Sequence, residues 1–264
     1  MSATQPITAG ERPAELAEEI LGGAGFAILP DAMTRAEAAE ARAVAIAEAS
    51  SSNVAGNSAR NDKIKHGSAR ALLHQGELFE RLVQQSRILA VAEQLLGDDL
   101  TLSSYSCRIM WPGAIEMGIH VDYPYWAMPE PYLIRPPLML QVIWMLQDFT
   151  ETNGATLLMP RSQLLATRPD PQRFRREAIK ITGSAGTAVL THGLLWHDTS
   201  PNQTPEPRVS LLINYGNKVI RPLDSEIANV PPEVLARATP KLRQLLGLEF
   251  RQSLNRDLSR QKLY

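Results

Sequence analysis

Cysteine is almost absent from this chain, whose 264 residues include only Cys107. One cysteine cannot form an intrachain disulfide, and it cannot supply the several thiolates of an iron–sulfur cluster or a thiolate-rich zinc site. A cytoplasmic setting is therefore expected. Charge of either sign is not in excess, since 27 basic and 28 acidic residues give a formal net charge of −1. The totals thus favour neither a nucleic-acid binder nor a membrane-surface binder.

Long apolar runs are missing as well. No stretch reaches the roughly 18 apolar residues that cross a bilayer. Residues 1–20 lack the basic and apolar regions of a signal peptide. With 44% hydrophobic and 21% charged residues, the composition is ordinary for a soluble globular protein with a substantial core.

The first hundred residues predict a helical layer. Residues 14–25 carry apolar side chains at helical spacing and end in glycines, while residues 34–50 open on a capping-box pattern. Residues 76–99 predict one or two amphipathic helices. A short strand is expected at residues 25–30. The polar, aperiodic residues 51–69 predict a mobile loop.

From residue 101 the pattern changes to short, mostly apolar segments separated by turn signals. Such a series favours a sandwich or barrel. We expect a mainly β protein whose core is an eight-stranded double-sheet jelly roll at residues 101–217. The helical layer at 1–100 and a helical tail at 218–264 would cover it within a single domain, residues 1–264. The eight expected strands lie at residues 100–111, 117–122, 137–149, 154–160, 178–183, 186–193, 194–199 and 208–216.

His120 and Asp122 form a candidate half of a metal site. Two residues that are two apart on a strand point to the same face, so both side chains can reach one ion. The alternative is a polar pair at a strand end. His197, between a strand pattern and a loop, is the favoured third ligand, and His192 is interpreted as a turn residue. Two histidines and one carboxylate are typical of non-haem Fe(II) oxygenases, and they can also hold a hydrolytic zinc ion.

Arg208 begins the last strand, eleven residues after His197. Strand alternation places Arg208 and Ser210 on one face, together with Leu212 and Asn214. A buried arginine needs an anionic partner, and its guanidinium group suits a carboxylate. The alternative is an ion pair at the strand end with Glu206 or Asp198.

Three segments together resemble a known family. HVD at 120–122, TNGATLLMPRSQ at 152–163 and WHDTSPNQTPEPRVSLLINY at 196–215 resemble the phytanoyl-CoA dioxygenase-like branch of the Fe(II)/2-oxoglutarate-dependent oxygenases. The resemblance implies a double-stranded β-helix core, with Fe(II) as cofactor and 2-oxoglutarate and O₂ as cosubstrates. One departure is local: relatives commonly read Pro-Gly-Ser-His where residues 160–163 read Pro-Arg-Ser-Gln.

The same resemblance implies roles for individual residues. His120, Asp122 and His197 would hold Fe(II). Arg208 would pair with the distal carboxylate of 2-oxoglutarate. The other cosubstrate-binding candidates are Thr199, Gln141 and Ser210.

The aromatic residues after Asp122 have two interpretations. Tyr123, Tyr125 and Trp126 either pack under the adjoining loop or form an apolar wall for the substrate. Residues 51–69 and 123–136 are expected to flank the pocket mouth as lids, because long irregular segments in compact domains are often functional.

The favoured function is therefore oxidation of an unactivated C–H bond in a small-molecule substrate, with 2-oxoglutarate decarboxylated to succinate. Hydroxylation is expected before desaturation or ring closure. A zinc-dependent hydrolase on a jelly roll is one alternative, although it has no evident use for Arg208. A non-catalytic jelly-roll binding module is the other. No nucleic acid or membrane partner is expected, and the sequence does not indicate an oligomeric state.

Overall fold

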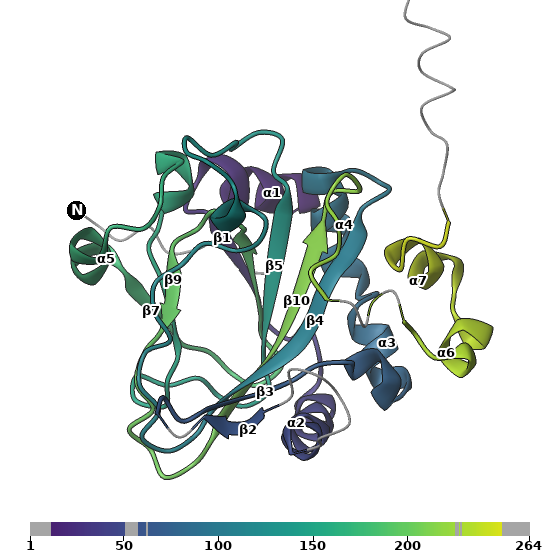
Figure 1. Ribbon diagram of the computed structural model, residues 1–264, viewed down its shortest axis with the longest axis horizontal. Coiled ribbons are helices and arrows are strands. Elements are labelled where there is room, and N and C mark those ends of the chain that lie inside the picture. Colours follow the sequence, from purple (N-terminus) through teal and green to yellow (C-terminus); the bar gives the residue numbers. More distant parts are fainter. Residues whose placement is uncertain (1–11, 51–57, 62, 225–226, 228, 250–264) are drawn as a thin grey trace, which may run out of the picture.

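Two antiparallel sheets of unequal size form the centre of the protein (Figure 1). The computed structural model describes residues 12–50, 58–61, 63–224, 227 and 229–249. Within these residues the strands are β1 (Phe26–Leu29), β2 (Ser58–Asn61), β3 (His66–Ala69), β4 (Thr101–Met110), β5 (Met139–Met145), β6 (Thr156–Leu158), β7 (Ile179–Ile181), β8 (Ala188–His192), β9 (His197–Thr199) and β10 (Arg208–Gly216). The larger sheet has the order β1-β8-β5-β10-β4-β3-β2, and the smaller sheet has the order β7-β6-β9.

Helices surround the larger sheet. The α-helices are α1 (Pro13–Gly22), α2 (Arg35–Ala49), α3 (Glu77–Leu82), α4 (Ser86–Leu96), α5 (Pro171–Glu177), α6 (Pro232–Arg237) and α7 (Pro240–Leu245). Short 3₁₀ turns occur at η1 (Leu72–Gln75), η2 (Tyr125–Ala127) and η3 (Ser162–Leu165). Helix α1 contacts β1 and β8, α2 contacts β3 and β10, and α4 contacts β5 and β10. In Figure 1 the smaller sheet stands on the left, α3, α6 and α7 lie to the right of β4, and α2 lies below the sheet.

Strand β10 shows how the larger sheet separates core from site. The side chains at alternate positions, Val209, Leu211, Ile213 and Tyr215, are fully buried in the main apolar core, which they share with the helices. The intervening side chains, Arg208, Ser210, Leu212 and Asn214, line a pocket on the opposite face. This is the alternation that the sequence predicts, and it follows from the two-residue repeat of a strand.

Most predicted elements are confirmed. The mainly β, jelly-roll-like core is present, with helices on its outer face. Helix α2 begins at the predicted capping box, in which the Glu37 N–H donates to Thr34 Oγ1 at 3.2 Å and the Thr34 N–H donates to Glu37 Oε2 at 3.0 Å. The predicted tail contains α6 and α7. Among the described residues, no helix combines the length and the apolar character that spanning a membrane requires.

The prediction of a structureless loop at residues 51–69 is wrong for the part that the structure describes. Residues 58–61 form β2 and residues 66–69 form β3, and they extend the larger sheet beyond β4. Residues 51–57 and 62 lie outside the described residues. These strands are short and polar, so neither shows the apolar alternation from which a strand is usually predicted. Backbone pairing of β3 with β4, and of β2 with β3, forms them instead.

Candidate metal centre

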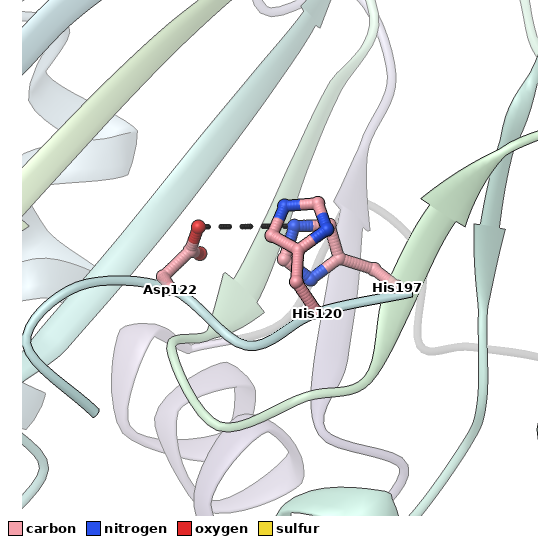
Figure 2. A group of neighbouring side chains, drawn as sticks. All are labelled: His120, Asp122 and His197. Carbon is pink, nitrogen blue, oxygen red and sulfur yellow. Dashed lines mark ion pairs between the residues drawn. The ribbon is translucent and has the colours of Figure 1, made fainter. Parts of the chain in front are cut away.

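A backbone bridge brings His120 and His197 together although they are 77 positions apart in the sequence. The His120 N–H donates to the His197 carbonyl at 3.1 Å, and the His197 N–H donates to the His120 carbonyl at 3.2 Å. Asp122 is fixed close by, because its N–H donates to the Gly193 carbonyl at 2.9 Å. The side chains of the three residues point toward one another (Figure 2). One ligand atom from each lies within 4.8 Å of the others, so the three can share one ion.

Hydrogen bonds to the backbone fix the tautomer of both histidines. Nδ1 of His120 lies 2.8 Å from the Gly118 carbonyl, and Nδ1 of His197 lies 2.9 Å from the Leu195 carbonyl. A carbonyl oxygen only accepts, so each Nδ1 carries the hydrogen and each Nε2 keeps a free lone pair. Burial lowers the pKa of His120 to about 4, with the neighbouring His197 contributing, and burial also lowers the pKa of His197. Both rings are therefore neutral near pH 7, as metal ligands must be.

Asp122 has one satisfied oxygen and one unsatisfied oxygen. Gln141, on β5, donates from Nε2 to Asp122 Oδ1 at 3.1 Å. Oδ2 is buried and has no hydrogen-bond partner in the described part of the chain. Burial raises the pKa of Asp122 to about 6, because a buried carboxylate without a counter-charge is costly. A divalent cation beside His120 and His197 would provide both the missing partner and the missing charge, so the donor set fits Fe(II).

Replacing Gln141 by leucine is expected to weaken metal binding. The amide holds Asp122 in place without reaching the ion, and loss of such a supporting hydrogen bond typically costs about 10- to 100-fold in metal affinity or activity. Anaerobic titration with Fe(II) measures the change directly. Gln172→Leu, on the exposed side of α5, is the matched control. An Fe(II) affinity that is the same in Gln141→Leu and in the parent protein would show that the amide does not position the carboxylate.

A pocket of about 180 Å³ lies beside the three candidate ligands, and all three line it. The rest of its wall comes mostly from strand residues, and residues with polar or charged side chains outnumber the apolar ones. Gln141, Thr199, Arg208 and Ser210, which the sequence predicts to bind the cosubstrate, all line this pocket. The sequence interpretation misses Thr156 in the wall, which pairs with Thr199 across β6 and β9.

Arg208 is 1% exposed and has no acidic partner among the described residues. Its Nε donates to the Gly154 carbonyl at 2.8 Å, one terminal nitrogen donates to the same carbonyl, and the other donates to Ser210 Oγ at 3.0 Å. The Phe149 ring lies 4.7 Å from its central carbon. The alternative of a strand-end ion pair with Glu206 or Asp198 is therefore not what the structure contains. Burial, together with the nearby charge of Arg108, lowers the pKa of Arg208.

The Asn-Gly turn at residues 153–154 presents that carbonyl. Gly154 has a φ of +87°, a conformation that side chains disfavour. A Cβ at this position would lie 3.3 Å from the Ser200 carbonyl oxygen and 3.4 Å from the Asn202 Cβ. Glycine thus allows the turn to pack closely enough for its carbonyl to hold the guanidinium group.

The unusual Pro-Arg-Ser-Gln turn supports the strand that carries His197. Arg161 adopts a left-handed conformation with φ of +66°. Ser162 donates to the Met159 carbonyl at 2.7 Å and accepts the Trp196 N–H at 2.8 Å. Gln163 donates to the Gly23 carbonyl at 3.2 Å, which ties the turn to the end of α1. The departure from the familiar motif therefore affects packing and leaves the ligand set intact.

The structure separates the three predicted aromatic wall residues. Tyr125 is fully buried in a second apolar cluster, and its hydroxyl accepts the Leu138 N–H at 2.7 Å. Tyr123 is partly buried, and Trp126, whose ring lies 5.9 Å from it, is 55% exposed. None of them is among the residues that line the pocket at the triad. Tyr125 thus has the packing role that was the alternative interpretation, whereas Trp126 borders a surface depression on the other side of His120.

His192 is buried at the end of β8, where the chain turns into Gly193. Its Nδ1 accepts the Leu194 N–H at 3.0 Å, and its ring stacks on Tyr125 with centroids 6.1 Å apart. The ring thus holds a turn together. This arrangement agrees with the interpretation of His192 as a turn residue and leaves His197 as the third candidate ligand.

The family model described as phytanoyl-CoA dioxygenase (PhyH) matches residues 22–210. A dioxygenase of Aspergillus fumigatus, af480, is 36% identical over 162 residues, which are 61% of this chain and 52% of that protein. L-proline trans-4-hydroxylase of Streptomyces griseoviridis is 25% identical over 53% of this chain and 63% of that enzyme. The chain thus spans about half to two thirds of the length of the curated relatives it matches.

A solved structure supports the fold. The epimerase SnoN, in complex with Fe3+, alpha ketoglutarate and nogalamycin RO, superposes with a TM-score of 0.64 and 21% identity, covering 86% of this chain and 92% of that chain. At this identity the likeness concerns the fold alone. The family match covers well over half of the chain. The chain therefore belongs to the phytanoyl-CoA dioxygenase (PhyH) family.

Proposed function

We propose that this protein is an Fe(II)/2-oxoglutarate-dependent dioxygenase that oxidises a small molecule within a single domain. One observation carries the proposal: a face of two histidines and one aspartate shares a pocket with a buried arginine that has no acidic partner among the described residues. A metal ligand set alone would suit several reactions. The guanidinium group of Arg208, which makes no ion pair within the described residues, adds a site for a carboxylate. When 2-oxoglutarate chelates a metal, its second carboxylate remains free to bind there.

The residues of the chain divide the work between holding the ion and holding the cosubstrate. His120 and His197 offer Nε2, and Asp122 offers the oxygen that Gln141 leaves free. A bound Fe(II) would supply the activation of O₂ that is coupled to decarboxylation of 2-oxoglutarate.

Arg208 has donors to spare for the cosubstrate. A guanidinium group has five N–H donors, and three hydrogen bonds join this one to Gly154 and Ser210. The remaining donors can bind the distal carboxylate. Thr199 adds a buried hydroxyl with no partner in the described part of the chain.

The substrate class rests on the relatives as well as on the pocket. The names of the relatives include dioxygenases and an L-proline hydroxylase, and SnoN was solved with a nogalamycin compound. We infer a small-molecule substrate and hydroxylation of a C–H bond as the reaction. Hydroxylation is favoured because the carboxylate position of the ligand set holds Asp122 and not a smaller residue. A zinc hydrolase would need the same three ligands, but it would leave Arg208 buried without a counter-ion.

Succinate formation tests this function. Purified protein is incubated with 2-oxoglutarate, O₂ and a panel of small metabolites, with either Fe(II) or Zn(II) as the only metal. We expect succinate and O₂ consumption with Fe(II), increased by at least one member of the panel, and neither with Zn(II). Hydrolysis of a panel member with Zn(II), without succinate under any condition, would favour the hydrolase.

Residues 123–136 are proposed to cover the site when substrate binds. The segment leaves Asp122 directly and is irregular apart from η2, and it carries the exposed Trp126. Hydrogen exchange, measured with Fe(II) and 2-oxoglutarate before and after adding a turnover-competent substrate, should show increased protection of this segment. Trp126→Ala should alter substrate preference, whereas Leu133→Ala, also exposed, serves as the control. Equal protection in the two states would argue against a cover. The corresponding expectation for residues 51–69 falls partly on residues 51–57 and 62, which lie outside the described ones, while residues 58–61 and 66–69 are strands of the larger sheet.

A further inference from the structure

One of the cations that line the pocket makes no ion pair with any acidic residue in the described part of the chain. Three arginines line it, and so do three aspartates. Asp122 is a candidate metal ligand, and Arg208 is assigned to 2-oxoglutarate. Arg70 and Asp224 form an ion pair at 2.7 Å. The cation that remains is Arg108, on β4.

The third aspartate does not neutralise Arg108. Asp198 Oδ1 accepts three backbone N–H groups, from Met117 at 3.1 Å, Gly118 at 3.0 Å and Thr199 at 2.7 Å. No ion pair joins Asp198 or any other described acidic residue to Arg108. Backbone donors stabilise the Asp198 charge where it stands, so this carboxylate has its own partners.

Arg108 is placed as a binding group. It stands directly opposite Ser210 in the β4–β10 register and opposite Ser68 in the β3–β4 register. Ser104 and Ser106 line the pocket beside it on the same face of β4. The Nε atom of Arg108 is buried and has no hydrogen-bond partner within the described ranges. Burial lowers the pKa of Arg108, and the charge of Arg70 contributes.

The charges of the proposed cosubstrate complex balance without Arg108 and Asp198. Fe(II), the Asp122 carboxylate, doubly charged 2-oxoglutarate and Arg208 together sum to zero. The Arg70–Asp224 pair is neutral as well. A buried cation without a counter-ion is unfavourable, and a guanidinium group suits a carboxylate. Asp198 balances the charge of Arg108 but makes no ion pair with it, so the primary substrate is the group that can give this guanidinium a directly bonded anion.

We propose that Arg108 binds a carboxylate of the primary substrate, so that the enzyme oxidises small carboxylic acids. The proposal rests on the proposed function, because it assigns 2-oxoglutarate to Arg208. A substrate in this pocket would contact the metal at one end and the face of β4 at the other, which directs a carbon of the acid toward the metal. The carboxylate sets both affinity and orientation.

The test compares acids with the matching amides, which lack the carboxylate charge. Protein loaded anaerobically with Fe(II) and excess 2-oxoglutarate, with loading measured first, is titrated calorimetrically with butyrate, phenylacetate and L-alanine and with the matching primary amides. One charge-assisted contact should make the acid of at least one pair bind roughly 10-fold or more tightly. Arg108→Met should bring that ratio to about one, and Arg108→Lys should retain part of it. Arg87→Met, on the exposed side of α4, should change nothing.

Three results would overturn the proposal. Equal binding, or no binding, of both members of every pair by the parent protein would remove the carboxylate class. A preference for the acid that survives in Arg108→Met would place the anion elsewhere. A rise in the 2-oxoglutarate requirement of Arg108→Met, without any change in acid preference, would make Arg108 part of the cosubstrate site. Failure of the parent protein to load Fe(II) and 2-oxoglutarate at all would instead refute the proposed function itself.

Discussion

Asp122→Ala is expected to abolish succinate formation while the fold survives. The variant loses the only carboxylate of the candidate ligand set, and two histidines alone leave the ion weakly held. Circular dichroism should show an unchanged fold, because the side chain contributes no apolar packing. Normal turnover in this variant would contradict the ligand assignment and point to another carboxylate, such as Asp198.

The same residue links metal binding to stability. The pKa of Asp122 is raised from 3.8 to about 6 in the folded metal-free protein. This group therefore stabilises the fold most below pH 3.8, and that contribution is lost as the pH rises through about 6. Above that range the buried charge costs up to about 3 kcal/mol at 1.36 kcal/mol per pKa unit. Asp122→Asn keeps an acceptor for Gln141 without the charge.

Thermal unfolding in the presence of a chelator checks this linkage. Asp122→Asn should have a higher Tm than the parent protein at pH 8, and the difference should disappear near pH 4. Added Fe(II) should raise the Tm of the parent protein only, since a ligand that binds the native state stabilises it. A lower Tm for Asp122→Asn at pH 8 would show that the carboxylate is satisfied within the protein.

Arg208→Ala is expected to raise the 2-oxoglutarate requirement. Loss of one buried, hydrogen-bonded charge pair typically costs about 2–5 kcal/mol. Because about 1.4 kcal/mol corresponds to a tenfold change in affinity, the requirement should rise roughly 30-fold or more. Arg208→Lys should restore little of the affinity, because lysine lacks the fork that donates to a carboxylate while holding Gly154. Titration of 2-oxoglutarate against bound Fe(II) gives the shift. An unchanged titration in Arg208→Ala would mean that this residue serves only to hold Gly154 and Ser210.

The pocket side of β10 was predictable because one face of the strand is buried in apolar core and the other is polar. Alternation in residues 208–216 was sufficient to group Arg208 with Ser210, and the structure places both at the pocket. The strand predicted at residues 117–122 is not formed: only His120 pairs, in an isolated bridge with His197, although His120 and Asp122 still lie together. His197 belongs to a segment distant from His120 in the sequence, so local spacing could not place it. The backbone bridge between the two residues explains why they meet.

Ion pairs between residues far apart in the chain could not be predicted from the sequence. Arg70 and Asp224 are 154 positions apart, and only the folded sheet places their ion pair in the pocket wall. Arg108 lies in a segment that the sequence predicts to be an alternating strand. Its place on the same face as Ser104 and Ser106 could have indicated a pocket residue. Tyr125 shows the reverse limit, because its place beside Asp122 in sequence did not put its ring in the same cavity.

The number of Fe(II) ions bound per chain tests the central claim most directly. Metal-free protein is mixed anaerobically with excess Fe(II) and 2-oxoglutarate, unbound metal is removed by gel filtration, and iron is measured by atomic absorption. The parent protein should retain one Fe(II) per chain, His197→Ala should retain none, and His74→Ala, which lies outside the candidate site, should retain one. An unloaded parent protein, or a fully loaded His197→Ala variant, would contradict the assignment of His120, Asp122 and His197 as the iron site.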